Sequence, residues 1–318
     1  MMTVRRGWSQ PSSILFATEI PANEKAFAFA LAQAMEGSAD LILFHACKAQ
    51  RTSAVGNPES RSADFAAARA VKKEFDPLLR RARDLNIGCR VAVRSGNAAE
   101  EILRFLEEHK VDRLVMGVHT PGPVGKLLVG SVAEAVLRKA RVPVTIVGPY
   151  LAEGAYRNMT TRTIFCPVDE HPSSSMAARL ASELAARHDA RLVLQRIIPP
   201  QQAAEVLAGR SLGQIEADLM EMIPPRLKGR IDVRTHVMEG DPTEELLYQS
   251  RILQANLIVM GAPRASHFAA LTHASTVYKV LAYAHCPVMT LSPVLLAGCT
   301  ALPAMVERAE VHYIAGVV

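Results

Sequence analysis

Short apolar runs alternate with longer stretches of helical periodicity along the first half of the chain. The runs lack strict alternation of apolar and polar residues and are flanked by turn residues, which is typical of strands buried on both faces. Between the first two runs, apolar residues from Phe27 to Met35 share one helix face, with Asn23 as the expected cap and Gly37 as the stop. A second, longer helix is expected at residues 64–86. We expect strands at residues 14–18, 41–46, 90–93, 114–116 and 144–147.

The same order of features occurs twice in the 318 residues. Residues 14–19 are echoed by residues 164–169, and three later landmarks of the first half recur 144 positions further along, beginning at residues 240, 256 and 286. Ordered repetition of this kind indicates two copies of one structural unit. Strands separated by helices imply right-handed crossovers, a parallel sheet and helices on both of its faces.

The predicted fold is therefore α/β, with two tandem doubly wound, Rossmann-like domains, each built on an open five-stranded parallel sheet. We place the first domain at residues 1–150, the second at residues 160–292 and a C-terminal tail of unknown role at residues 293–318. Ligands of such sheets bind beyond the carboxyl ends of the strands, so the loops that follow strands are the places to search for a site.

Composition narrows the class of protein chiefly by exclusion. Hydrophobic residues make up 49% and charged residues 21%, which argues against intrinsic disorder. Aromatic residues at 5% and a net charge of only +5 argue against a dedicated nucleic-acid or membrane-surface binder, and no run of about 18 apolar residues is present to cross a bilayer. The five cysteines include no CxxC pair, so neither a disulfide framework nor a zinc site is indicated. We expect a cytoplasmic protein without nucleic-acid or membrane partners.

The loop after the fourth expected strand carries the strongest functional signal. Gly117 ends that strand, and a residue without Cβ there would let a ligand approach the backbone closely. Gly130 and Ser131 open the next helix, whose free N–H groups and positive dipole end favour an anion such as a nucleotide phosphate. Ser131 and Glu134 also fit a capping box, in which the two side chains satisfy the helix's own first N–H groups. The sequence leaves both interpretations open.

The spacing of this loop resembles the nucleotide signature of the universal stress protein family, in its tandem form with two domains in one chain. Gly117, two residues, Thr120, nine residues and Gly130-Ser131 reproduce the spacing, with threonine in place of the signature's second glycine. The resemblance extends over nearly all of residues 13–292. It implies an adenine-nucleotide-hydrolase-like fold, a role in the stress response, and binding of ATP or a related adenine nucleotide with Mg²⁺ accompanying it.

Other positions carry the same resemblance. His45-Ala46 is similar to the family's His-Val pair at the end of the second strand, and Pro143 and Pro287 match its fifth strand. Because that strand usually mediates dimerisation in the family, the two halves are expected to pair with each other there. The resemblance also implies protein partners of unknown identity and a homodimer.

Candidate binding residues follow from the resemblance position by position. Glu19 occupies the place of an acidic residue after the first strand, and Ala46 and Met116 match positions that line the adenine pocket. The positions around the ribose and phosphates are matched by Gly117, Thr120, Gly130, Ser131 and Val132. No catalytic and no metal-ligating residues are assigned.

The second half departs further from the signature. Asp169 is the expected acidic residue, but Arg264 and Ala274 stand where glycines are expected. The guanidinium of Arg264 would either fill the phosphate space or bind a different anion. The resemblance therefore implies nucleotide binding in the first domain only.

Three classes of function stay open after this comparison. The leading hypothesis is a nucleotide-responsive sensor or regulator that is not an enzyme. The second is an interaction module in which both nucleotide sites have decayed, and the third is a slow ATPase. No HExxH or HxxxH pattern indicates a metal site, and the basic residues of the second helix fit a solvated face.

Overall fold

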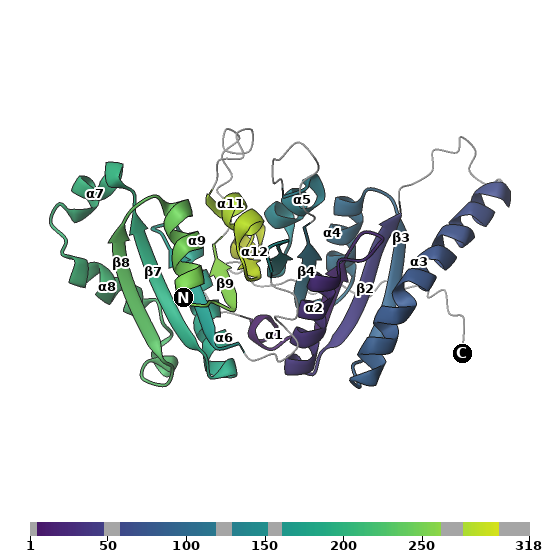
Figure 1. Cartoon of the computed structure of the whole chain (residues 1–318), viewed down its shortest axis with the longest axis horizontal. Coiled ribbons are helices and arrows are strands. Elements are labelled where there is room, and N and C mark those ends of the chain that lie inside the picture. The colour runs from purple at the N-terminus through teal and green to yellow at the C-terminus, as the bar shows by residue number, and fades with distance from the viewer. Residues whose placement is uncertain (1–4, 48–57, 119–128, 152–160, 262–275, 299–318) are drawn as a thin grey trace.

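The computed structural model describes residues 5–47, 58–118, 129–151, 161–261 and 276–298. Its strands form one ten-stranded sheet in the order β3-β2-β1-β4-β5-β10-β9-β6-β7-β8 (Figure 1). The first half contributes β1 (Ser13–Ala17), β2 (Asp40–Cys47), β3 (Cys89–Ser95), β4 (Arg113–Gly117) and β5 (Val144–Val147). The second half contributes β6 (Thr163–Val168), β7 (Arg191–Ile198), β8 (Val233–Glu239), β9 (Leu257–Met260) and β10 (Val288–Thr290).

This arrangement confirms the α/β class and the two doubly wound halves that the sequence predicts. Within each half, all paired strands run parallel. The structure differs from two separate open sheets in one respect, because β5 and β10 pair in antiparallel fashion and join the halves edge to edge. The expected pairing of the halves through their fifth strands is therefore present.

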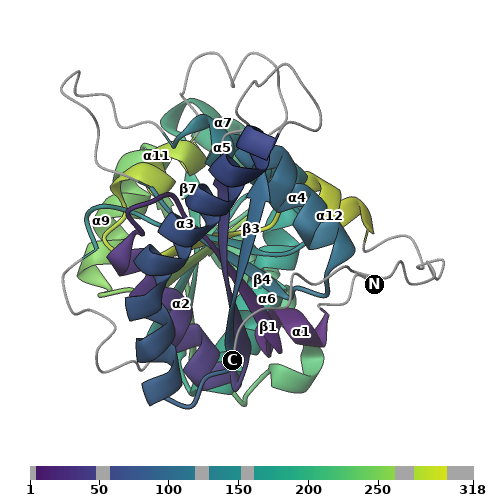
Figure 2. The same cartoon turned by 90° about the vertical axis from the view of Figure 1, so that its right-hand side faces the viewer.

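Helices cover both faces of the continuous sheet. One face carries α2 (Glu24–Gly37), α3 (Pro58–Asp84), α6 (Pro172–His188) and α8 (Leu212–Glu221). The other carries α4 (Ala98–Glu108), α5 (Ser131–Lys139), α9 (Pro242–Ile252) and α11 (Thr276–Tyr283). Figure 2 shows α3 and α4 on opposite sides of β3. Because strands buried on both faces need apolar cover on each, the chain holds two buried clusters, and each cluster runs through both halves.

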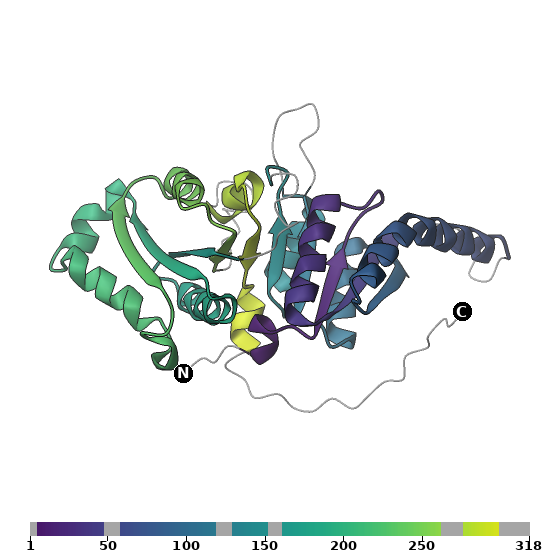
Figure 3. The same cartoon turned by 60° about the horizontal axis from the view of Figure 1, so that its bottom comes forward.

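Four short helices complete the part of the chain that the structure describes. They are α1 (Arg6–Ser9), α7 (Pro200–Leu207), α12 (Pro293–Gly298) and the 3₁₀ helix η1 (Pro225–Leu227). The residues after Ser292, for which the sequence indicates no role, begin with α12, and Leu295 on this helix is buried. Figure 3 shows α1 and α12 at the seam between the two halves.

Local side-chain caps explain where several helices start. Asn23 caps α2 as predicted, since its Oδ1 accepts a hydrogen bond from the backbone N of Ala26 at 3.0 Å. Asn97 and Asp241 cap α4 and α9, the two helices that begin in the repeated glycine and glutamate stretches. Acidic residues occupy the first turn of both helices, where they complement the helix dipole.

Two helix boundaries differ from the sequence prediction. Gly37 is the last residue of α2 rather than the residue after it. Ser38 follows as the C-terminal cap and takes the left-handed conformation with φ of 51°. The second helix begins at Pro58 rather than residue 64 and ends at Asp84. Proline is well placed at the start of a helix because its missing N–H would have no partner there.

The antiparallel pairing of β5 and β10 defines a pseudo-twofold axis. Thr145 pairs with Met289, which is its own counterpart 144 positions later in the repeat. Val144 and Ile146 pair with Thr290 and Val288 on either side of it. The two halves therefore meet as the two copies of a symmetric dimer do, with equivalent residues facing each other.

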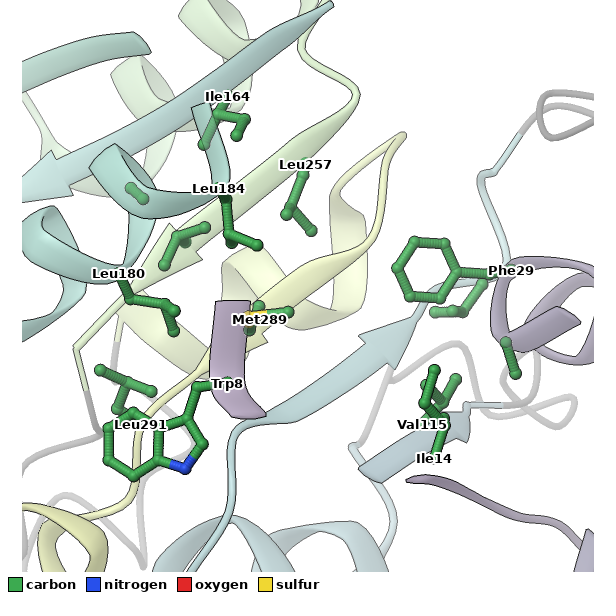
Figure 4. Packing of buried hydrophobic residues seen from close by; sticks show 14 of the residues in the cluster. Trp8, Ile14, Phe29, Val115, Ile164, Leu180, Leu184, Leu257, Met289 and Leu291 are labelled. Carbon is green, nitrogen blue, oxygen red and sulfur yellow. The ribbon is translucent and has the colours of Figure 1, made fainter. Parts of the chain in front are cut away.

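The N-terminal helix α1 crosses this junction. Trp8 is 2% exposed, and its indole lies beside Leu180, Met289 and Leu291 of the second half (Figure 4). The aromatic ring thus anchors a segment that precedes the first strand onto the core of the other half.

A buried arginine holds the backbone of α1 in place. The guanidinium of Arg113 donates to the carbonyl oxygens of Trp8 at 2.7 Å and Ser9 at 3.1 Å, and to the Gln33 side chain. Burial lowers the pKa of Arg113 to about 10, so the side chain remains charged at neutral pH. These hydrogen bonds are needed because an unpaired buried cation is strongly destabilising.

A second polar contact links α2 to α6 beside this arginine. His188 Nδ1 lies 3.5 Å from Glu36 Oε2, and Arg187 Nη2 donates to the Glu36 carbonyl oxygen at 2.9 Å. Burial, together with the charges of Arg113 and Arg187, lowers the pKa of His188 to about 4. Burial raises the pKa of Glu36, and the same two arginines oppose that rise. His188 is therefore neutral at pH 7.

Truncation of Trp8 tests how strongly the junction depends on α1. We expect Trp8→Ala to lower the free energy of unfolding by about 3 to 5 kcal/mol, because it leaves a cavity between the halves. Urea denaturation followed by circular dichroism measures the loss. Tyr248→Ala, at an α9 side chain that is 59% exposed, is the control and should cost about 0.5 kcal/mol or less. Equal losses in the two variants would contradict an anchoring role for Trp8.

Acidification should weaken the fold through His188. The unfolded chain takes up a proton near pH 6.5, whereas folded His188 resists protonation until about pH 4, so stability falls as the pH drops between these values. We expect the wild type to lose about 2 kcal/mol relative to His188→Gln between pH 7.5 and pH 5. Urea titrations of both proteins at each pH give this difference. A constant difference across the range would show that His188 does not contribute.

Candidate functional site

The predicted pocket residues gather at one edge of the first half of the sheet. Strands β2, β1 and β4 are adjacent, and Ala17 pairs with Phe44 on one side and Met116 on the other. Glu19 and Ala46 each follow two residues after this row. Glu19, Ala46 and Met116 therefore share the carboxyl edge, where ligands of doubly wound sheets bind.

Three of the remaining predicted positions form the start of α5, and one lies outside the described residues. Gly130 precedes the helix, and Ser131 and Val132 are its first two residues. Because α5 connects β4 to β5, its N-terminus lies toward the same carboxyl edge. Thr120 belongs to residues 119–128, which the structure does not describe.

The turn after β1 is held by backbone and side-chain contacts. His45 Nδ1 lies 2.9 Å from the carbonyl oxygen of Thr18, so this nitrogen carries the proton. The backbone N of Asn23 donates to Thr18 Oγ1 at 3.1 Å. Glu19 lies between these contacts, and its exposed carboxylate makes no hydrogen bond or ion pair within the described part of the chain. The turn thus presents a carboxylate at the carboxyl edge of the sheet.

The structure gives a packing reason for glycine at position 117 that the sequence does not show. A Cβ at this position would lie 2.4 Å from Cγ of Asn23, the side chain that caps α2. At the equivalent position of the second half, a Cβ on Gly261 would lie 2.4 Å from Ser173 Oγ. Both glycines thus make room for the start of a helix. This packing is a second reason for glycine beside the expected approach of a ligand, and the position of Gly117 in the site stays a prediction.

The start of α5 bears on one of the two interpretations of Ser131. Gly130 takes the capping position, with φ of −51° and ψ of 157°, and Ser131 is already helical and exposed. Among the described residues no side chain caps the helix, so the structure does not contain the capping box, and binding of an anion stays a prediction. Glu134 instead forms an ion pair with Arg138.

Free backbone donors remain at this helix end. The first hydrogen bond of the helix runs from the backbone N of Glu134, which donates to the Gly130 carbonyl oxygen at 3.0 Å. The N–H groups of Ser131, Val132 and Ala133 make no hydrogen bond to any residue that the structure describes. Three unpaired donors and the positive end of the helix dipole favour an anion at this point.

No described residue fills the space in front of Gly130. A Cβ built on Gly130 would lie more than 4 Å from every described heavy atom. Its φ is negative, so other residues adopt this backbone without strain. A larger side chain at Gly130 would therefore project toward the helix end without disturbing the fold.

The position equivalent to Ala46 is more closely filled in the second half. Strand register makes Ile197 the counterpart of Ala46, because Leu192 pairs with Ile164 as Leu41 pairs with Ile14. The Ile197 side chain is 7% exposed and fills the position that Ala46 leaves partly open in the first half. This difference could not be found from the sequence alone, because the numbering offset between the two halves changes between the first and the second strand. Only the strand register shows that Ala46 and Ile197 are equivalent.

The acidic residue of the second half is also engaged. The carboxylate of Asp169 accepts hydrogen bonds from the backbone N of His171, at 3.0 Å, and from Ser174 Oγ. Arg196, the counterpart of His45, is nearly buried and places Nη2 3.2 Å from Glu170 Oε1. The equivalent of the first-half turn is therefore closed by its own side chains.

One further sequence pattern has a purely structural explanation. Residues 209–213 read G-x-S-x-G, the pattern of a hydrolase nucleophile elbow. The serine is Ser211, which caps α8 and forms a capping box with Gln214. It lies between two helices rather than after a strand, as an elbow requires. Within the described residues, no group of three His, Cys, Asp or Glu side chains is placed to hold a metal ion, and no helix has the length and apolar character to cross a membrane.

Solved structures share this arrangement. A universal stress protein from Archaeoglobus fulgidus DSM 4304 is similar with a TM-score of 0.68 at 19% sequence identity, covering 90% of this chain and 97% of that chain. A functionally unknown protein from Pseudomonas aeruginosa PAO1 is similar with a TM-score of 0.61 at 17% identity, covering 92% of this chain and 97% of that chain. At these identities the likeness concerns the fold.

Curated relatives match shorter segments. A universal stress protein of Mycolicibacterium smegmatis is 41% identical over 54 residues, which are 17% of this chain and 42% of that protein. Universal stress protein MJ0531 of Methanocaldococcus jannaschii is 42% identical over 52 residues, which are 16% of this chain and 31% of that protein. The matched segments thus span less than half the length of these relatives.

The fold and the site define a tandem doubly wound α/β protein with an open helix end at the carboxyl edge of one half. The profile of the universal stress protein family matches residues 12–148 and again residues 160–292. The chain therefore belongs to the universal stress protein family and contains two of its units.

Gly117 can be tested through its contact with Asn23. We expect Gly117→Ala to lower the free energy of unfolding by about 2 kcal/mol, because the new methyl group overlaps the Asn23 side chain. Asn23→Gly removes that side chain and costs a few tenths of a kcal/mol as a cap, roughly. The double variant should then be about as stable as Asn23→Gly alone. Thermal and urea unfolding of the four proteins measure this, and additive losses would contradict the proposed packing.

Proposed function

We propose that this protein binds an adenine nucleotide, ATP or a close relative with Mg²⁺, in its first half only, and acts in the cytoplasm as a stress-response sensor or regulator rather than as an enzyme. The observation that carries the proposal is the N-terminus of α5, where no described residue caps the helix, pairs with its first three N–H groups or obstructs Gly130. The position of this helix end in the signature of the family supports a nucleotide as the anion.

The residues at the edge fit the parts of such a ligand. The N–H groups at the start of α5 and the Ser131 hydroxyl would bind phosphate oxygens. Ala46, which is partly exposed, offers an apolar surface for adenine with the buried Met116 behind it, and Glu19 offers a carboxylate at the same edge. The nucleotide would bring the negative charge that this helix end favours, and Mg²⁺ would offset the charge of its phosphates.

Restriction to the first half rests on the contrast between the two sites. Ile197 occupies the space that Ala46 leaves open, and Asp169 is engaged by His171 and Ser174. In the first half, the corresponding residues are a partly exposed alanine, Ala46, and an exposed glutamate, Glu19, whose carboxylate has no partner among the described residues.

Protein partners would bind elsewhere than the fifth strands. Strand β5 lies between β4 and β10, so neither fifth strand offers a free edge to a second copy. A homodimer of this chain would therefore use another surface, such as the outer strands β3 and β8.

The substitution Gly130→Val tests the site. Valine would occupy the space in front of α5 without straining the backbone, so we expect MgATP affinity to fall at least about tenfold with an unchanged melting temperature. Calorimetric titration of nucleotide-free protein measures affinity and stoichiometry, and the wild type should bind about one nucleotide per chain. Ala274→Val, at the same motif position of the second half, is the matched control and should bind as the wild type does.

Other outcomes would separate the rival functions. Two nucleotides per chain, or equal effects of the two valine variants, would contradict a first-half site. No heat of binding at millimolar ATP and no thermal shift would favour an interaction module without nucleotide. Release of ADP during the titration would identify a slow ATPase.

A further inference from the structure

Arg138 on α5 connects the start of its own helix to the second half. Its Nη2 forms an ion pair with Glu134, four residues earlier on the same helix. Its Nε lies 3.4 Å from the hydroxyl oxygen of Tyr278 on α11. In Figure 1, α5 and α11 lie next to each other above the centre of the sheet.

This contact breaks the internal symmetry of the chain. Tyr278 is the repeat counterpart of Glu134, and Ala282 is the counterpart of Arg138. The second half therefore has no glutamate and arginine pair of its own on α11. It contributes instead a tyrosine whose ring packs against the apolar cluster of α5 and α11 and whose hydroxyl points to Arg138.

Glu134 has two alternatives at the start of α5. The sequence Ser131 to Glu134 favours a capping box, in which the carboxylate would turn back to the first N–H groups of the helix. In the structure, the carboxylate is drawn along the helix to Arg138. The carboxylate thus makes no hydrogen bond to the first N–H groups, which have no partner among the described residues, and the negative charge of Glu134 is neutralised one turn from Ser131.

We propose that Tyr278 and Arg138 position Glu134 away from the N-terminus of α5, so that the second half of the chain keeps the first-half nucleotide site open. The inference rests on the proposed function for its ligand. Arg138 acts through Glu134 rather than on the nucleotide, and Tyr278 acts through Arg138. The second half thus contributes to a site to which it offers no ligand contact.

The expected effect follows from charge. Without Arg138, the carboxylate of Glu134 remains near the helix end, where it competes with phosphate for the N–H groups and repels it. We expect Arg138→Met to weaken MgATP binding about five- to tenfold. We expect Tyr278→Phe to weaken it about two- to threefold, because this variant keeps the ion pair between Arg138 and Glu134 and removes only the hydroxyl that Arg138 contacts.

A set of variants tests each link of this chain of contacts. Arg138→Met and Tyr278→Phe are compared with Lys139→Met, which removes one positive charge from the adjacent exposed position of α5. The double variant Glu134→Gln with Arg138→Met removes the carboxylate that Arg138 restrains, and should recover wild-type affinity. Calorimetry measures the dissociation constant for MgATP, and thermal unfolding verifies that each protein is folded.

Hydrogen exchange gives a readout that needs no nucleotide. In Arg138→Met, the released carboxylate should accept a hydrogen bond from the Ser131 N–H, so that the Ser131 amide exchanges more slowly than in the wild type. This separates the positioning from the function on which it rests. If the wild type shows no MgATP binding, the proposed function fails, and the exchange rates alone decide the positioning.

Three results would overturn the inference. Equal affinities of Arg138→Met and Lys139→Met would show that only net charge matters. If the double variant Glu134→Gln with Arg138→Met binds MgATP no better than Arg138→Met alone, Arg138 does not act through Glu134. Wild-type behaviour of Tyr278→Phe in both affinity and amide exchange would remove the second half from the mechanism.

Discussion

The antiparallel pairing of β5 with β10 is the interaction on which the rest of the molecule depends. A parallel five-stranded sheet exposes the N–H and C=O groups of its last strand, and each half covers that edge of the other. The pairing also makes both apolar clusters continuous across the junction. Helices from opposite halves are therefore brought into contact, α1 with α6 on one face and α5 with α11 on the other.

Much of this architecture was predictable because local chemistry and repetition agree. The buried strands are short apolar runs, Asn23 caps the helix that the spacing indicates, and the repeat identifies the second half. Other features depend on contacts between distant residues. The need for glycine at position 117 is set by Asn23, and the closure of the second site by Ile197 requires strand register. The capping box considered at Ser131 is absent because the helix begins one residue earlier, with Gly130 as its cap, and Glu134 pairs with Arg138.

A single chain with two units differs from a homodimer in how its sites can diverge. In a homodimer, each substitution appears in both copies, so a residue that closes one site closes the other. Here Ala46 and Ile197 occupy equivalent positions but differ in side-chain size. Likewise, the position equivalent to Glu134 is a tyrosine, Tyr278. Equivalent positions of the two halves can therefore take different structural roles, which two identical chains cannot do.

The position of Trp8 has a consequence for how the protein is made. Ribosomes release the N-terminal segment first, yet the partners of Trp8 include Leu180, Met289 and Leu291, which all belong to the second half and are synthesised later. The first half therefore emerges with an indole that lacks these partners and with an unpaired β5 edge. Leu180 follows in the middle of synthesis, whereas Met289, Leu291 and the cover of the β5 edge arrive only with β10. The interval between these events is the period in which the nascent chain is most exposed to aggregation.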